Sequence, residues 1–526
     1  MWDYLLSGGT LIDGTGRPGY RADLAVENGK IAAIGRLDAK NARAVVPAAG
    51  RAVTPGFLDI HRHADAAVFR PGFGQLELRQ GLTTIVNGNC GLSLAPCPDN
   101  RRAIYGYLTP VTGAPDGETP TETLAAYQKA AGQTNPPLNL GMLAGAGTIR
   151  AAAAGFGTEQ LDAEQVSRVH ALLEQALSDG ALGVSLGLGY APECFYTTDG
   201  LIEALHPLQS SGVPVTVHMR QEGSGVVGAL DEMLAVARAL RTPVHISHLK
   251  AIGKANWGRC MPEMLQKLSR AREDGLDVSC DVYPYTAGST QLIHILPPEC
   301  QTGGVAELSQ NLRRPEFRRH LRERMETGSD FENISLLVGW ENIVMSSLRR
   351  PENQRFAGKS ILDAARGRGQ DPFDCAFDLL ADEDCAITMI DFIAAESDIE
   401  AALRSPFVSV ISDSTYPTTG LLHPRVYGTY ARLLERYVRE RRVLTLEQAV
   451  ERVTSRPAAL FGLRDRGVLA AGRSADLCVF DPARVHEAGT YADPARFAEG
   501  MEYVFVNGVP AIAAGEFTGS AAGKIL

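Results

Sequence analysis

The chain has 526 residues, of which 45% are hydrophobic and 21% charged, a balance typical of a soluble globular protein with a large core. Its formal net charge is −10 and no face is dense in lysine or arginine, which argues against nucleic acid and anionic membranes as partners. The nine cysteines are odd in number and scattered, and we find neither a signal peptide nor an apolar span of about 18 residues. We therefore expect reduced thiols and a cytoplasmic location.

Short strands joined by turns are expected at both ends of the chain. In the first 55 residues they are Tyr4–Ser7, Thr10–Ile12, Ala22–Val26 and Ile31–Ile34. Near the C-terminus they are Ala475–Phe480, Tyr503–Val506 and Val509–Ala513, with an Asn-Gly turn between the last two. Because an isolated meander cannot bury its apolar face, we expect residues 1–55 and 465–526 to form one small β-sandwich domain.

Between these ends, residues 56–464 alternate apolar strand-like runs with amphipathic helices. The strand-like runs include Phe57–Ile60, Thr84–Val86, Gly141–Ala144, Gly183–Ser185, Val213–His218, Val244–His248, Val278–Asp281 and Val408–Ser412. The helical patterns include Asp162–Ser178, Gly225–Ala239 and Met261–Glu273. Repeated strand and helix alternation predicts a parallel sheet, and this number of repeats favours an α/β fold with a closed (β/α)8 barrel.

A charged stretch at about 297–330 breaks this alternation. It contains an arginine-rich helical pattern, and we expect an insertion over the mouth of the barrel. A helix of this composition is most often a solvated face, and a lid that touches the substrate is the alternative.

His61 and His63 follow the first barrel strand, after the Pro55-Gly56 break. Side chains two residues apart on a strand share a face, so both imidazoles point the same way. Neutral imidazole is the commonest metal ligand, and barrels of this class carry their chemistry at the carboxyl ends of the strands. The spacing predicts a metal pair there.

Three further strand ends carry candidate ligands. His218 and His248 each close a strand, and position favours His248 over His245, which we expect to pack behind it. Cys90 lies in Asn87-Gly88-Asn89-Cys90-Gly91, where the glycines allow the backbone to bring a thiolate close to a metal.

Asp413 ends the last apolar run and supplies a carboxylate at the same edge. A carboxylate beside a bound cation stays ionised and can accept a proton from water that the metal acidifies. Without the histidines, the same residue would be interpreted as a helix N-cap.

These motifs, in this order, resemble the amidohydrolase superfamily and, more closely, the D-aminoacylases, also called N-acyl-D-amino-acid deacylases. The resemblance runs nearly end to end. It rests on Gly56–His61, Asn89-Cys90-Gly91, His218–Gly223, Ile246–Lys250, Asn256-Trp257-Gly258, Asp281–Tyr285 and His423–Gly428.

The resemblance implies one tightly held zinc on Cys90, His218 and His248. It also implies a second, weaker metal position at His61 and His63, which Cys90 can bridge. Asp413 would activate water and protonate the leaving amine. Tyr190, Lys250, Tyr283 and Arg425 match positions that grip the substrate α-carboxylate in this family, which suits their chemistry.

The expected reaction is hydrolysis of a small-molecule N-acyl-D-amino acid. Hydrolysis of a cyclic amide, of the hydantoinase or dihydroorotase kind, is the first alternative, although Cys90 stands where those enzymes use a carboxylated lysine. A larger amide substrate and a catalytically silent barrel also remain open. Apolar Leu292, Ile293, Ile295 and Leu296 favour a substrate with a hydrophobic side chain, while the arginines of the insertion leave an acidic side chain open. Assembly into a homo-oligomer is also open.

Overall fold

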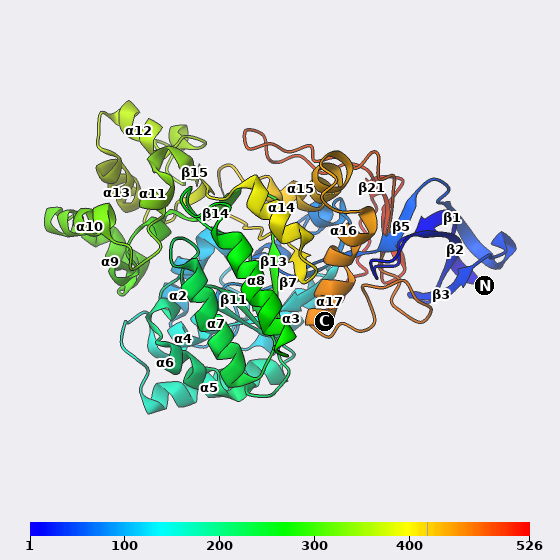
Figure 1. Ribbon diagram of the computed structural model, residues 1–526, viewed down its shortest axis with the longest axis horizontal. Helices are drawn as coiled ribbons and strands as arrows, with labels where there is room; N and C mark the ends of the chain where they lie inside the picture. The colour runs from blue at the N-terminus through cyan, green and yellow to red at the C-terminus, as the bar shows by residue number, and fades with distance from the viewer. Residues whose placement is uncertain (418) are drawn as a thin grey trace.

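The computed structural model describes residues 1–417 and 419–526 and contains a parallel barrel between two smaller parts (Figure 1). The barrel strands, in chain order, are β6 (Phe57–Asp59), β7 (Leu82–Asn87), β8 (Asn139–Met142) with β9 (Ala144–Gly145), β10 (Val184–Gly187), β11 (Val215–His218), β12 (Val244–Ile246), β13 (Val278–Val282) and β17 (Val408–Val410).

All pairings between neighbouring barrel strands are parallel. Strands β6, β7 and β8 form one sheet, and β9, β10, β11, β12, β13 and β17 form another. Strands β8 and β9 are separated by one residue and follow each other in the barrel wall. A parallel bridge between Arg62 and Ser414, just past the ends of β6 and β17, joins the first barrel strand to the last. Each expected strand overlaps one of the barrel strands, with β8 and β9 counted together, so the predicted (β/α)8 fold class is confirmed.

Helices surround these strands because their apolar faces pack on the sheet. Local sequence signals fix where these helices begin. The helix α5 (Ala163–Ser178) begins with a capping box in which Asp162 and Gln165 exchange hydrogen bonds. The helices outside the insertion are α1 (Gln75–Leu78), α2 (Arg101–Thr112), α3 (Leu124–Gln133), α4 (Ala146–Ala154), α5 (Ala163–Ser178), α6 (Thr198–Ala204), α7 (Val226–Leu240), α8 (Cys260–Glu273), α14 (Glu396–Arg404), α15 (Arg425–Arg432), α16 (Leu446–Val453) and α17 (Ser455–Leu460).

Strands from both ends of the chain form one nine-stranded sheet at the opposite end of the molecule from the insertion (Figure 1). They are β1 (Trp2–Leu11), β2 (Tyr20–Glu27), β3 (Lys30–Gly35), β4 (Ala42–Pro47), β5 (Ala52–Pro55), β18 (Leu477–Phe480), β19 (Met501–Val506), β20 (Val509–Ala513) and β21 (Glu516–Phe517). The two strands expected at Tyr4–Ser7 and Thr10–Ile12 are a single strand, β1, whose pairing with β2 shifts register between Leu6 and Gly9. Leu6, Leu24 and Phe505 share one core, so both ends of the chain bury each other's apolar faces.

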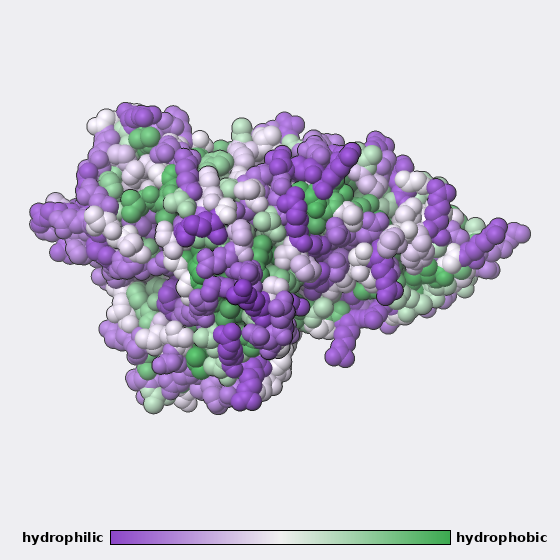
Figure 2. Space-filling view, in the orientation of Figure 1, coloured by the Kyte–Doolittle hydropathy of each residue, from purple (hydrophilic) through white to green (hydrophobic). Residues whose placement is uncertain are grey.

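The segment between β13 and β17 carries its own antiparallel sheet. Its strands are β14 (Ala287–Gln291), β15 (Ile343–Ser347) and β16 (Thr388–Phe392), and its helices are α9 (Gly304–Asn311), α10 (Pro315–Thr327), α11 (Ile334–Val338), α12 (Ile361–Arg368) and α13 (Pro372–Asp382). The charged stretch 297–330 supplies α9 and α10 of this insertion. In Figure 2 its outer tip, over α9 and α10, is covered mainly by hydrophilic residues.

Among the residues that the structure describes, no helix is both long enough and apolar enough to cross a bilayer.

Candidate metal centre and substrate cavity

Five candidate ligands meet at the carboxyl ends of the barrel strands. Two groups of donor atoms share Cys90, one with His61 and His63 and one with His218 and His248, and within each group the atoms lie within 4.8 Å of one another. Cys90 Sγ is 3.2 Å from His61 Nε2 and 3.4 Å from His248 Nε2, which is 3.1 Å from His218 Nδ1. All five side chains are buried.

This donor set fits a divalent metal. Tetrahedral zinc with bonds of about 2.0–2.3 Å places its ligand atoms about 3.3–3.8 Å apart, close to the separations around His248. His61 and His248 hold the pKa of the Cys90 thiol well below its usual value, against the effect of burial, which favours the thiolate that metals bind. His61 Nδ1 and His63 Nδ1 have no hydrogen-bond partner in the described part of the chain.

The backbone at three of these positions is left-handed. Cys90 has φ 54°, His248 φ 37° and Asp413 φ 52°, a region that costs free energy for residues other than glycine. The next residue, Gly91, has φ 71° and lies so close to the Glu193 side chain that a Cβ at this position would be 1.9 Å from Glu193 Oε2. The loops after β7, β12 and β17 are thus held in conformations that turn these side chains to one point.

Glu222 is a buried carboxylate that the sequence analysis did not single out. Its Oε1 lies 3.0 Å from His248 Nδ1, and its Oε2 lies 2.6 Å from Lys250 Nζ and 3.6 Å from His218 Nε2. Coordination through His248 Nε2 requires the ring proton on Nδ1, and Glu222 is placed to accept it. The only sequence signal was its place in the His218–Gly223 motif.

Asp281 is a second carboxylate that the sequence analysis left without a role. Its Oδ2 lies 2.9 Å from His245 Nε2 and 3.8 Å from His61 Nδ1, and its Oδ1 accepts a hydrogen bond from the His248 backbone N–H. Burial acts to raise the pKa of Asp281, but His245 and His61 lower it overall, so the group is ionised. His245 packs behind the cluster, as the sequence indicated.

Asp413 faces the histidine pair and a buried arginine. Its Oδ1 lies 3.4 Å from His61 Nε2 and 3.3 Å from His63 Nε2, and its Oδ2 lies 3.0 Å from Arg425. Although burial opposes ionisation, Arg425 and the histidines hold the pKa of Asp413 well below its usual value. The carboxylate is therefore charged and fixed in direction.

A cavity of about 40 Å³ opens beside this cluster. Its lining includes His218, Glu222, His248 and Asp413 from the barrel, together with Tyr190, Lys250, Ile252, Tyr283, Gly288, Ser289, Thr290, His294, Glu332, Ile334, Asp391 and Ile393. The candidate ligands His218 and His248 and the side chains of Asp413 and Lys250 therefore face the same cavity.

The four residues matched to carboxylate binding lie on or next to this cavity. The Tyr190 ring lies 4.3 Å from the ring of His218, and Lys250 Nζ lies 5.9 Å from the centre of the Tyr283 ring. Arg425 is fully buried behind Tyr283, 4.9 Å from its ring centre, and donates to the Ser289 carbonyl at 3.0 Å.

The apolar residues expected at the side-chain pocket lie elsewhere. Leu292, Ile293, Ile295 and Leu296 are packed in the main core, while His294 between them lines the cavity. The apolar part of the lining consists of Ile252, Ile334 and Ile393 instead.

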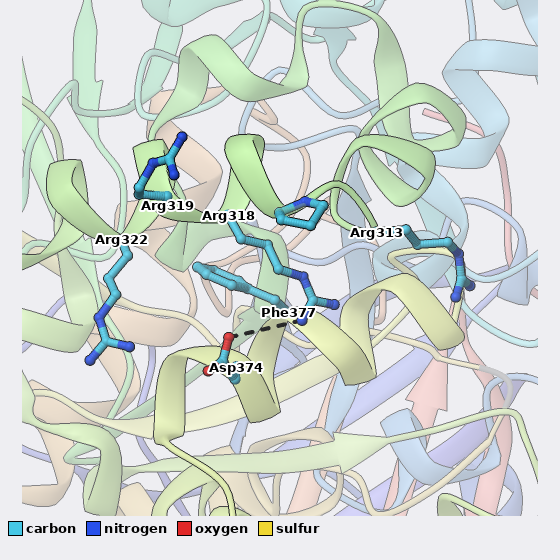
Figure 3. A pocket seen from close by; sticks show the side chains of 7 residues that line it. Arg313, Arg318, Arg319, Arg322, Asp374 and Phe377 are labelled. Carbon is cyan, nitrogen blue, oxygen red and sulfur yellow. Dashed lines mark ion pairs between the residues drawn. The ribbon is translucent and has the colours of Figure 1, made fainter.

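Two arginines of α10, Arg318 and Arg322, pair with residues of α13 or at its start, beside a groove of about 640 Å³ (Figure 3). Arg318 lies 2.6 Å from Asp378 and 3.9 Å from Asp374, and Arg322 lies 3.2 Å from Asp371. None of these arginines lines the cavity beside the metal cluster as described. They hold one insertion helix against another.

The chain is similar to known proteins over its whole length. Residues 44–512 match the model of the amidohydrolase family. The chain is 35% identical to a D-aminoacylase of Alcaligenes xylosoxydans xylosoxydans, over all of this chain and 97% of that one.

Two solved structures are similar over the whole chain. One is the N-acyl-D-glutamate deacylase of Bordetella bronchiseptica, complexed with zinc and a phosphonate that mimics the tetrahedral intermediate. It is 33% identical with a TM-score of 0.85, covering 100% of this chain and 99% of that one. The other, a D-aminoacylase described with a binuclear metal centre, is 32% identical with a TM-score of 0.84 and full coverage of both chains. The chain therefore belongs to the amidohydrolase family, in the branch of the D-aminoacylases and N-acyl-D-amino-acid deacylases.

Proposed function

We propose that the chain hydrolyses the amide bond of N-acyl-D-amino acids and releases a carboxylate and a free D-amino acid. One observation carries this proposal: a buried cysteine and histidine cluster, an ionised aspartate and a lysine meet at a single cavity. The end-to-end similarity to D-aminoacylases adds the substrate class.

In this proposal Cys90, His218 and His248 hold a tight zinc, and His61 and His63 form a weaker position that shares Cys90. Their donor separations support the assignment. When bound, the metal supplies Lewis-acid polarisation of the amide carbonyl and acidifies water. Glu222 and Asp281 keep the imidazole rings in the orientation and tautomer that coordination needs.

Asp413 moves the proton. Its carboxylate accepts a proton from the attacking water and delivers it to the amine nitrogen as the C–N bond breaks. Arg425, 3.0 Å away, keeps the carboxylate ionised and aimed at the histidine pair before each turnover. A weak base would be sufficient at this position, because a metal held by the cluster would acidify the water.

Lys250, Tyr283, Tyr190 and Arg425 hold the α-carboxylate. Lys250 donates to Glu222 at 2.6 Å and lies 2.8 Å from His248 Nδ1, and its ammonium has three N–H groups, so one donor remains for a ligand. Fixing the carboxylate at one point and the amide carbonyl at another leaves a single direction for the side chain of a D-amino acid.

Paired N-acetyl-D- and N-acetyl-L-amino acids test the function. Free amine would be measured for Leu, Met, Phe, Lys, Glu and Asp in both series, with hydantoin and dihydroorotate as cyclic controls, on enzyme of known metal content. We expect turnover in the D series only. Comparable turnover of the L series, or of cyclic amides alone by metal-loaded enzyme, would contradict the proposal.

We also propose a reducing, cytoplasmic location, supported by nine cysteines that are all free thiols. Self-association stays a prediction.

A further inference from the structure

Two acidic side chains of the insertion face the substrate cavity. Asp391 lies in β16, and Glu332 lies just before α11; both line the cavity. Asp391 is only 2% exposed, and its Oδ1 has no hydrogen-bond partner among the described residues. A buried carboxylate oxygen without a donor costs free energy unless a ligand supplies the donor.

The space in front of Asp391 is kept open by a glycine. Gly288 pairs directly with Asp391 across β14 and β16. A Cβ on Gly288 would lie 2.9 Å from Asp391 Oδ1 and 3.3 Å from Tyr283 Oη. The unpartnered carboxylate oxygen thus borders the same gap as Tyr283, one of the residues proposed to hold the substrate.

Only two of the four carboxyl groups that line the cavity in the described residues have a lysine or arginine beside them. Glu222 is paired with Lys250 and Asp413 with Arg425. Within the described residues, neither Glu332 nor Asp391 has a cationic partner at ion-pair distance; Glu332 accepts only the backbone N–H of Glu222.

Burial raises the pKa of Asp391 to about 6 and that of Glu332 to about 8. A cation arriving from a ligand would stabilise both groups in their charged forms.

Three isoleucines share the cavity lining with these carboxyls. They are Ile252, Ile334 and Ile393, and Ile393 Cδ1 lies 2.9 Å from the position of a Cβ on Gly288, beside the same gap as Asp391 Oδ1. A cavity lined by isoleucines and by carboxyls fits a methylene chain with a terminal cation.

We infer that Asp391 and Glu332 form the far end of the side-chain pocket and select N-acyl-D-amino acids whose side chain ends in an amine or a guanidinium. This inference rests on the proposed function and names its substrate class. It separates the chain from the N-acyl-D-glutamate deacylase to which it is similar, because an acidic side chain would meet two further carboxyls.

The test compares side chains that differ in charge at similar length. The kcat/KM would be measured for N-acetyl-D-lysine, N-acetyl-D-norleucine and N-acetyl-D-glutamate with zinc-loaded wild type, Asp391→Asn, Glu332→Gln and Glu326→Gln. Glu326 is the control, since its carboxylate pairs with Arg322 on exposed α10.

We expect wild type to prefer lysine over norleucine by about tenfold to a hundredfold, the range of a hydrogen bond to a charged group, and to be slowest on glutamate. Asp391→Asn should remove most of that preference and Glu332→Gln part of it, judged by the lysine-to-norleucine ratio within each variant, and Glu326→Gln should keep the wild-type ratio. A wild-type lysine-to-norleucine ratio of one or below overturns the inference alone, whether or not the variants fold. An unchanged ratio in folded Asp391→Asn does the same. Absence of turnover on every N-acetyl-D-amino acid overturns the proposed function with it.

Discussion

Cys90 is the residue shared by both halves of the metal centre. It contacts His61 on one side and His248 on the other, and both histidines favour its thiolate. The neighbouring buried thiol of Cys97 behaves in the opposite way, because burial raises its pKa to about 12. Two cysteines of similar burial thus differ in their capacity to bind a metal.

Replacing Cys90 by serine should therefore release the tight metal. A serine hydroxyl is a poor ligand for zinc, so we expect less than about a tenth of the wild-type zinc after dialysis, and activity to fall with it. Cys97→Ser is the matched control and should keep both. Metal content is read by plasma emission spectrometry; a Cys90→Ser protein with full zinc would contradict the ligand assignment.

Asp413→Asn separates proton transfer from metal binding. The amide is nearly isosteric but accepts no proton at neutral pH, so kcat should fall by about 10²–10⁴-fold while zinc content stays unchanged. Asp231→Asn serves as a control, because Asp231 is an exposed partner of Lys267 on the outer helices. Wild-type kcat in Asp413→Asn would show that another group moves the proton.

The strand-end residues could be predicted from sequence because parallel strands end at one edge and the side-chain period is two. His218 ends β11, and Asp413 follows β17 by three residues, so their convergence follows from topology. Glu222 and Asp391 could not be predicted in this way. Glu222 lies in an irregular loop, and Asp391 reaches the cavity only because the insertion folds back over the barrel.

At the scale of elements, ion pairs hold α10 against α13, and no arginine of α10 lines the substrate cavity as described. Arg318 of α10 pairs with Asp374, as Figure 3 shows, and with Asp378 of α13, and Arg322 pairs with Asp371, the N-cap of α13. The composition of α10 alone indicated a solvated face, and its partners could not be assigned because α13 lies some sixty residues later, for example at Asp378 opposite Arg318.

Arg318→Ala should loosen this pair without affecting catalysis. Partly exposed ion pairs contribute about 0.2–1 kcal/mol, so we expect faster amide hydrogen exchange in α10 and unchanged kcat/KM. Amide hydrogen exchange in α10 should stay slow in the control variant Arg319→Ala, since Arg319 makes no ion pair within the described residues. A loss of kcat/KM in Arg318→Ala would favour the lid.

The same pair should weaken in acid. Burial acts to raise the pKa of Asp378, but hydrogen bonds from Arg318 and Gln370 lower it overall, below its usual 3.8. A carboxyl with a lowered folded-state pKa stabilises the fold above its unfolded pKa of about 3.9 and loses that contribution as pH falls through the folded value. Exchange in α10 of wild type should therefore approach that of Arg318→Ala below about pH 4.

At the scale of the molecule, a buried aspartate joins the barrel to the terminal sheet. Asp476 pairs with Arg466 at 2.5 Å and accepts hydrogen bonds from Asn139 of β8 at 3.1 Å and from the Asn507 backbone at 2.6 Å. We propose that 1–55 with 465–526 forms one domain and 56–464 the other; this contact supports their close packing.

Asp476→Ala should lower the free energy of unfolding by about 3–5 kcal/mol, because it removes the buried partner of Arg466 and leaves the Asn139 and Asn507 donors without their acceptor. Asp465→Ala removes a partner of the same arginine whose side chain is 54% exposed, and should cost less than about 1 kcal/mol. Urea denaturation followed by circular dichroism measures both. Equal losses would show that the buried contact is not what joins the two parts.

The most direct test of the metal centre is anomalous diffraction at the zinc edge from crystals of the zinc-loaded protein. We expect the strongest peak among Cys90, His218 and His248, about 2.3 Å from the sulfur and about 2.0 Å from the nitrogens, with a weaker peak at His61 and His63. A zinc peak outside this cluster, or one that Cys90 does not contact, would contradict the proposed site and the mechanism built on it.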